Sequence, residues 1–189
     1  MSTEPDNAIG KVVLIGHSTG CQDAVSYMRY GTPELRSHVQ GVVLQAPASD
    51  REYRVTQAGT DNFVEEAWAR TSDELMPRAA EKVPITASRY LSLTVKGGDD
   101  DMFSSDLSTD ELLHCLGHMN VPTLAVFSDN DQYVPLREGR EMQDLAQQLC
   151  SAMPGAVTPL VVKGGDHALS SQQAREEFVA AVKAFVSGL

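Results

Sequence analysis

Short apolar runs recur along this chain and predict its strands. The runs at 11–15, 41–45 and 123–127 are rich in β-branched residues and flanked by glycine or proline, which is typical of strands buried on both faces. A further strand is expected at 159–162.

Segments with apolar residues at every third or fourth position lie between these runs. One such segment begins at Gly20 and stops near Gly31, one surrounds Leu145, and the last reaches Leu189, so each predicts a helix. Because strands and helices alternate, we expect an α/β fold with a parallel sheet of about four strands and helices on both faces.

A long stretch at 48–120 interrupts the alternation. It holds an amphipathic segment around Phe63 and Trp68, and a helix opened by Ser108 with Glu111 at capping-box spacing. We interpret the stretch as a lid-like insertion within a single domain that spans 1–189.

The sequence Gly-His-Ser-Thr-Gly lies between the first predicted strand and the first predicted helix. In this context GxSxG is typical of a nucleophile elbow, which makes Ser18 the candidate nucleophile. We expect Gly16 and Gly20 to be required sterically, since side chains on either side of the strained serine would collide. The Thr19 N–H, at the start of the helix, is the candidate oxyanion donor.

A serine hydroxyl needs an imidazole to take its proton, and the chain has five histidines. His167 fits best, because it lies in a Gly-rich loop just after the last predicted strand. His17 is the immediate neighbour of the serine and faces the wrong way for a base. His38 precedes a strand, whereas His114 and His118 lie in a helix and at its end.

The acid that orients the imidazole should follow the strand at 123–127. Asp129 and Asp131 both qualify. We choose Asp131 because it precedes Val-Pro at the spacing that hydrolase turns show, and Asp129 stays the alternative.

Other polar and aromatic residues have ordinary interpretations beside their functional ones. His17, Phe63 and Trp68 are candidate substrate-binding residues, with Met76 as a further part of an acyl pocket under the lid. Cys21 is expected to be a small core residue, and the acidic run at 99–101 to be solvated surface. We therefore expect neither a metal nor a cofactor.

Five blocks of the sequence resemble the family of fungal and plant hydrolase-like proteins labelled DUF1749. They are GHSTGCQDAVSYM at 16–28, LQAPASDREY at 44–53, PITASRYLSL at 84–93, GGDDDMFSSDL at 97–107 and SDNDQYVP at 128–135. The resemblance implies an α/β-hydrolase fold and hydrolysis of carboxylic esters or similar acyl compounds by Ser18, Asp131 and His167. It implies no particular substrate.

Composition narrows the partners and the compartment. The net charge of −11 repels nucleic acid and anionic membrane surfaces, which leaves a small acyl or ester molecule as the expected partner. Residues 1–7 lack the features of a secretory signal, and no apolar run is long enough to span a membrane. With three cysteines at spacings that suit neither disulfides nor zinc, we expect a cytoplasmic protein.

The chain departs from a full α/β-hydrolase at its start, because ten residues precede the elbow strand. We expect it to be the C-terminal half of that fold, without the loop that gives the second oxyanion donor. Losing one donor costs about 3 kcal/mol, or roughly a hundredfold in rate, which predicts weak or no turnover by this chain alone. The strand at 11–15 should then be an open edge, available for complementation or self-association. A non-catalytic relic or binding module, and an acyltransferase with the same triad, are the alternative functions.

Overall fold

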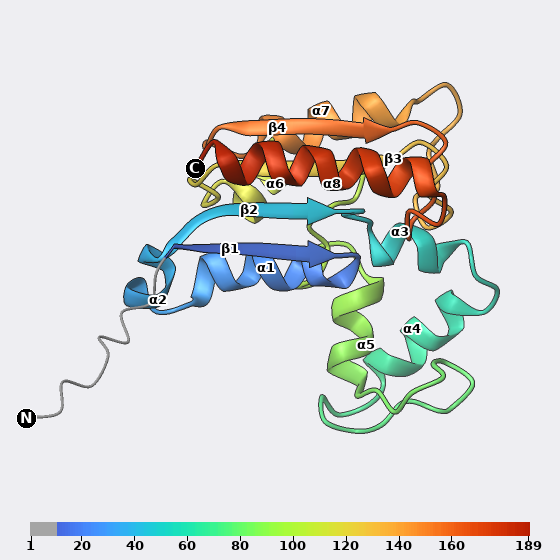
Figure 1. The fold of residues 1–189 in the computed structure, drawn as a ribbon. Helices are drawn as coiled ribbons and strands as arrows, with labels where there is room; N and C mark the ends of the chain where they lie inside the picture. Colours follow the sequence, from blue (N-terminus) through green and yellow to red (C-terminus); the bar gives the residue numbers. More distant parts are fainter. Residues whose placement is uncertain (1–10) are drawn as a thin grey trace, which may run out of the picture.

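The computed structural model describes residues 11–189, so the prediction made for residues 1–7 lies outside the described part of the chain. Four strands and eight helices follow one another along it (Figure 1). The strands are β1 (Val12–His17), β2 (Val39–Gln45), β3 (Thr123–Ser128) and β4 (Val157–Val162). The helices are α1 (Thr19–Tyr30), α2 (Pro33–Ser37), α3 (Asp50–Val55), α4 (Thr60–Trp68), α5 (Ala87–Thr94), α6 (Thr109–Leu116), α7 (Met142–Ser151) and α8 (Gln172–Ser187).

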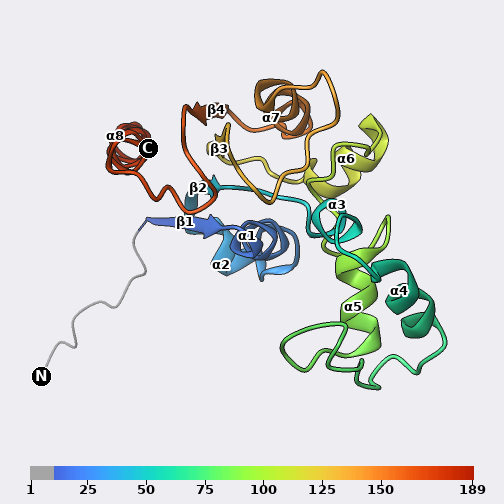
Figure 2. The same ribbon diagram turned by 90° about the vertical axis from the view of Figure 1, so that its right-hand side faces the viewer.

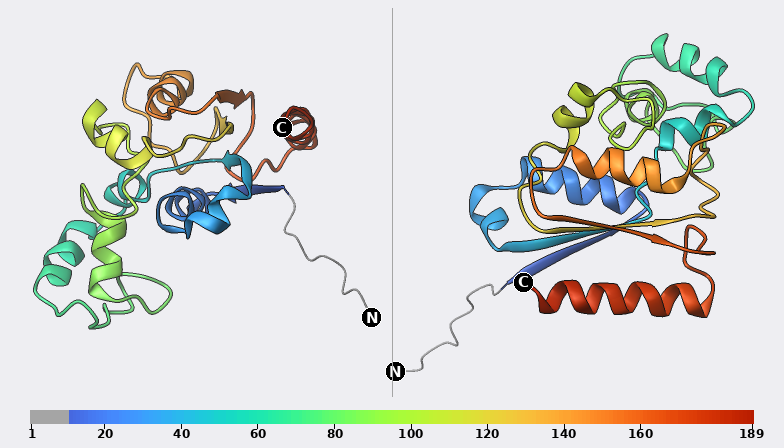
Figure 3. Two further views of the ribbon diagram at one scale, coloured as in Figure 1. Left: turned by 90° about the vertical axis from the view of Figure 1, so that its left-hand side faces the viewer. Right: turned by 90° about the horizontal axis from the view of Figure 1, so that it is seen from above.

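The strands form one parallel sheet in the order β1-β2-β3-β4. Helices α1 and α7 pack on one face, and α8 lies along the opposite face (Figure 3). The predicted α/β fold, with a parallel sheet of four strands between helices, is therefore confirmed.

The central strands are apolar on both faces because successive side chains enter different cores. In β2, Leu44 packs with α1 and α7, whereas Val43 packs with α8. The same alternation places Phe127 of β3 in the first core and Val126 in the second, each 2 % exposed or less. A continuous apolar run is the expected pattern for a parallel strand covered on both sides.

Strand β1 differs from its prediction as a strand buried on both faces. Within residues 11–189 it pairs with β2 alone, and its Ile15 side chain is 58 % exposed. The strand is therefore an edge of the described sheet. This agrees with the expectation that the strand at 11–15 is an open edge. An exposed apolar edge strand is a ready site for pairing with another chain.

Four helices occupy the stretch at 48–120, of which α4 and α6 were predicted and α3 and α5 were not. The predicted capping box of α6 is present, with Ser108 Oγ accepting from the Glu111 N–H and Glu111 accepting from the Ser108 N–H. Helices α3, α4 and α5 lie beyond the carboxyl ends of the strands (Figures 1 and 2). Tyr90 and Ile85 belong there to a small apolar cluster that is separate from the main core. Leu116 of α6 belongs to the main core.

Of the acidic run at 99–101, only Asp99 is exposed as the sequence predicted, and the other two residues are buried. Asp100 and Asp101 are 8 % and 3 % exposed. Asp101 accepts from the Arg51 Nε–H at 3.0 Å, and Asp100 pairs with Arg89. Arginines from distant helices neutralise the two buried carboxylates, so the run fastens α3 and α5 to the following loop. No cluster with the makings of a metal site occurs in the described residues, nor does any described helix have the length and apolarity to cross a membrane.

Candidate active site

Ser18 occupies a strained turn between β1 and α1. Its backbone has φ 54° and ψ −125°, a conformation that costs energy for any residue with a side chain. The Ser18 N–H donates to the Gln45 carbonyl oxygen at 3.0 Å, which ties the turn to the end of β2. This strand-to-helix geometry is that of a nucleophile elbow, which presents a hydroxyl above the end of a sheet.

The two flanking glycines are not equivalent. A Cβ on Gly16 would lie 2.2 Å from the Gly20 carbonyl oxygen, so no larger residue fits at this position without a shift of the backbone. A Cβ on Gly20 would meet no atom within 4 Å. The prediction that both glycines are sterically required is therefore wrong for Gly20, whose position is an ordinary one in the first turn of α1.

His167 and Asp131 form a buried pair beyond the ends of β4 and β3. The His167 Nδ1 lies 2.8 Å from Asp131 Oδ2 and 2.9 Å from Oδ1, and each residue is 7 % exposed. Asp131 Oδ1 also accepts the Tyr133 N–H at 2.9 Å. Because a carboxylate can only accept, the Nδ1 carries the proton, and Nε2 is the nitrogen free to act as a base.

Asp129, the alternative acid, has a different partner. Its Oδ1 accepts the Gly164 N–H at 2.6 Å, and the residue is exposed. Asp131 is thus the carboxylate that the structure brings to His167, whereas Asp129 fastens the β3 loop to the loop that follows β4.

Ser18 and His167 line the same cavity, which has a volume of about 690 Å³. The Tyr133 ring lies 4.6 Å from the His167 ring and 4.7 Å from that of Tyr53, measured between centroids, so an aromatic wall covers the imidazole. The rest of the lining comes from helices α3, α4 and α5, from the turn between α3 and α4, and from the 78–82 loop. It includes Asp50, Arg54, Gln57, Ala58, Thr60, Phe63, Arg78, Ala79, Ala80, Glu81, Lys82 and Tyr90. The 48–120 stretch, interpreted from the sequence as a lid-like insertion, therefore forms most of the cavity wall.

Charged side chains of both signs lie around this cavity. Arg54 pairs with Glu81 at 2.8 Å. Burial raises the pKa of the Asp50 carboxyl, against the opposing charge of Arg54. Arg78 and Lys82 also line the cavity and form no ion pair with any residue in 11–189. Arg78 Nη1 donates instead to the Lys82 carbonyl oxygen at 2.8 Å.

Some of the predicted substrate-binding residues line the cavity and others do not. His17 and Phe63 line the cavity. Trp68 does not, and it is 65 % exposed, because on α4 it lies five residues after Phe63 and thus on another side of the helix. Met76 is buried in the small cluster behind α5 and does not reach the cavity either.

Several residues of the site were not found from the sequence. Tyr53, Tyr90, Tyr133 and Gln45 lie in the blocks that carry the family resemblance but were given no role. Tyr133 stands two positions after Asp131 and could have been considered for that reason. The buried Cys21 thiol, predicted as a core residue, is fully enclosed. Burial raises the pKa of that thiol, which makes it a poor nucleophile.

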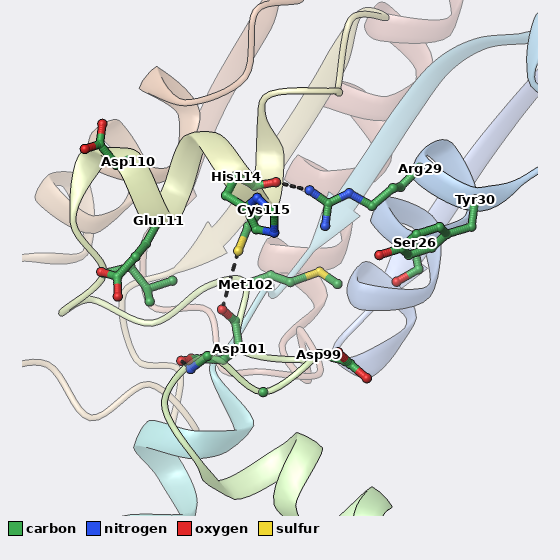
Figure 4. A pocket seen from close by; sticks show the side chains of 13 residues that line it. Ser26, Arg29, Tyr30, Asp99, Asp101, Met102, Asp110, Glu111, His114 and Cys115 are labelled. Atoms are coloured by element: carbon green, nitrogen blue, oxygen red, sulfur yellow. Dashed lines mark hydrogen bonds between the residues drawn. The ribbon is translucent and has the colours of Figure 1, made fainter.

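A second cavity, of about 590 Å³, lies between α1, α6 and the 97–102 loop (Figure 4). Arg29 donates to the His114 carbonyl oxygen there, and the Cys115 thiol contacts the Asp101 carbonyl oxygen at 3.8 Å. No hydrogen bond within the described residues joins Ser26, which also lines it, to an imidazole. Burial raises the pKa of the Cys115 thiol, so this cavity offers no activated nucleophile.

A parallel sheet with the elbow after one strand, and with an acid and an imidazole after later strands, defines the α/β-hydrolase fold. The family is settled by a family model. The model "Protein of unknown function (DUF1749)" matches residues 2–187, and the chain belongs to this family.

Named relatives include two esterases, one of Aspergillus fumigatus and one of Emericella nidulans. The chain is 31 % identical over 177 residues to the fusarinine C esterase sidJ of Aspergillus fumigatus, with 67 % of this chain and 50 % of that protein covered. It is 29 % identical over 150 residues to the UPF0613 protein PB24D3.06c of Schizosaccharomyces pombe, covering 68 % of this chain and 47 % of the relative. The chain thus spans about half the length of these relatives.

A solved structure supports the fold. The monoacylglycerol lipase of Paleococcus ferrophilus superposes with a TM-score of 0.58 at 18 % sequence identity, with 94 % of this chain and 69 % of the lipase covered. At this level of identity the match concerns the fold.

Proposed function

We propose that the protein is a serine hydrolase that cleaves carboxylic esters or related acyl compounds through Ser18, His167 and Asp131. The observation that supports this most is the buried His167–Asp131 pair, whose imidazole lines the same cavity as the strained Ser18. The distant relationship to a named esterase supports the hydrolase class.

In this mechanism His167 Nε2 takes the Ser18 hydroxyl proton while Oγ attacks the acyl carbon. Asp131 keeps the Nδ1 proton in place and stabilises the imidazolium that forms. The oxyanion of the tetrahedral intermediate accepts from the Thr19 N–H, which belongs to the first residue of α1 and has no acceptor within the helix.

The acyl-enzyme then forms and is hydrolysed, with His167 acting first as an acid and then as a base. The intermediate collapses when the leaving alcohol departs with the proton from His167, and the acyl group stays on Ser18 Oγ. His167 then takes a proton from water, which attacks the ester carbon of the acyl-enzyme. When this second tetrahedral intermediate collapses, His167 returns the proton to Ser18 Oγ and the acid is released. An alcohol that enters the cavity instead of water would accept the acyl group, and this transfer is the alternative outcome of the same chemistry.

Single-turnover reaction with an activated ester such as p-nitrophenyl butyrate tests this proposal. We expect nitrophenol release together with a butyryl mass on Ser18, and loss of both in Ser18→Ala. Ser26→Ala, at the second cavity, is the matched control and should react like the natural protein. Release that persists unchanged in Ser18→Ala would count against the proposal, whereas butyryl transfer to an added alcohol would identify an acyltransferase.

A further inference from the structure

Gln45, the last residue of β2, lies at the centre of the contacts around the site. Its backbone carbonyl oxygen accepts from the Ser18 N–H at 3.0 Å and from the Cys21 thiol at 3.2 Å. Its side-chain Nε2 donates to the His167 carbonyl oxygen at 3.1 Å, and its Oε1 is hydrogen-bonded to His17 Nδ1. One residue, 6 % exposed, thus contacts the elbow and the loop that carries the imidazole.

These contacts determine the orientation of the Gln45 amide. A backbone carbonyl can only accept a hydrogen bond, so the group that faces the His167 carbonyl oxygen must be the NH₂ of the side chain. The other end of the amide is then the oxygen, which can only accept. His17 Nδ1 must therefore carry a proton.

A neutral imidazole with a proton on Nδ1 has its lone pair on Nε2. His17 lines the cavity beside Ser18, and no residue in 11–189 forms a hydrogen bond with its Nε2. The ring also lies 5.0 Å from that of His167 between centroids. His17 Nε2 is therefore a hydrogen-bond acceptor beside Ser18 and His167 that has no donor within residues 11–189.

We propose that Gln45 is a positioning residue that fixes the His17 imidazole in the Nδ1–H form, and that His17 Nε2 accepts a hydrogen bond from a hydroxyl or N–H group of the substrate. The second part rests on the proposed function, because it assigns the substrate class of the same cavity. Esters that carry a hydroxyl, amide or amine donor near the scissile bond are then preferred to plain aliphatic esters.

The first part is tested by ¹⁵N NMR of histidine-labelled protein at about pH 9, where imidazoles are neutral. We expect His17 to show a protonated Nδ1 and an unprotonated Nε2. Gln45→Met removes both side-chain hydrogen bonds, so His17 should populate both its Nδ1–H and its Nε2–H tautomer. Amide exchange in the 164–169 loop should become about tenfold faster, because the bond to the His167 carbonyl oxygen is lost. Gln45→Glu keeps an acceptor for His17 but no donor for the His167 carbonyl, so it should preserve the His17 signature and still loosen the loop.

Gln143→Met, on the exposed side of α7, is the matched control and should change neither readout. A His17 that carries its proton on Nε2, or a Gln45→Met spectrum identical to that of the natural protein, would overturn the first part.

The second part is tested in Ser18→Ala, which does not turn over esters by the proposed route. Methyl 3-hydroxybutyrate should shift the His17 Nε2 resonance, whereas methyl butyrate should leave it in place. Equal effects of the two esters, including no effect of either, would overturn the substrate preference. Because neither experiment requires hydrolysis, their failure differs from failure of the proposed function, which would appear as a natural protein that forms no acyl-enzyme.

Discussion

Replacement of Asp131 by asparagine should change the proton position on His167 without unfolding the protein. Asp131 Oδ1 accepts the Tyr133 N–H, so the oxygen of an asparagine stays at that position. The new NH₂ group then occupies the place of Oδ2, which lies 2.8 Å from His167 Nδ1. An NH₂ group there can only donate and would face an Nδ1–H donor. The asparagine oxygen, 2.9 Å from Nδ1, is already the acceptor of the Tyr133 N–H, so we expect the imidazole proton to move to Nε2.

An imidazole with its proton on Nε2 has no lone pair toward the serine and does not act as its base. In a serine hydrolase triad this exchange lowers kcat by about 10⁴-fold, which corresponds to about 5.5 kcal/mol of transition-state stabilisation. We expect a loss of about 10³ to 10⁴ in the rate of Ser18 acylation, with a melting temperature within a few degrees of the natural one. A ratio between variants is independent of how many oxyanion donors the protein has.

The rate of nitrophenol release in a single turnover measures this effect. Asp129→Asn is the matched control, since the asparagine oxygen can still accept the Gly164 N–H and the residue does not contact His167. It should react at the natural rate. A rate within about tenfold of natural for Asp131→Asn, or an equal loss in both variants, would refute the assignment of the acid.

Three further predictions concern the elbow, the core and the edge strand. Gly16→Ala should lower the free energy of unfolding by about 3 kcal/mol or more because of the 2.2 Å contact, whereas Gly20→Ala should be neutral or stabilising by about 0.5–1 kcal/mol; urea unfolding compares them, and equal losses would contradict the structure. Burial lowers the pKa of His118, with Arg29 and Arg36 adding to it, so the unfolded state binds a proton more readily and stability should fall as pH drops below about 6.5. His118→Gln should lessen that fall in unfolding curves at about pH 7.5 and 5.5, and an undiminished fall would show that another group is responsible. Ile15→Lys should reduce self-association and binding of an apolar dye, measured by size exclusion and fluorescence. A natural protein that is already a monomer and binds no dye would contradict this prediction.

The elements that the sequence predicted well are those with local signals. Continuous apolar runs marked β2 and β3 because both faces of these strands are covered, and the strand-turn-helix pattern around Ser18 marked the elbow. Chain order brought Asp131 and His167 to the same edge of the sheet, since the strands are parallel.

What the sequence did not reveal depends on contacts between distant residues. Helix α3 has no buried residue to mark it by apolar spacing; a Ser49 cap and the ion pairs of Arg51 hold it in place. Gln45 acts through partners 28 and 122 positions away, which no local pattern encodes. Trp68 was misplaced because periodicity gives the spacing on a helix but not which side faces a cavity.

The location of covalent modification tests the central claim most directly. After incubation with a fluorophosphonate probe and digestion, mass spectrometry should find the adduct on the peptide that contains Ser18, and heat-unfolded or Ser18→Ala protein should carry none. An adduct on another residue, or a folded protein whose Ser18 stays unmodified while a known serine esterase in the same tube reacts, would contradict the account.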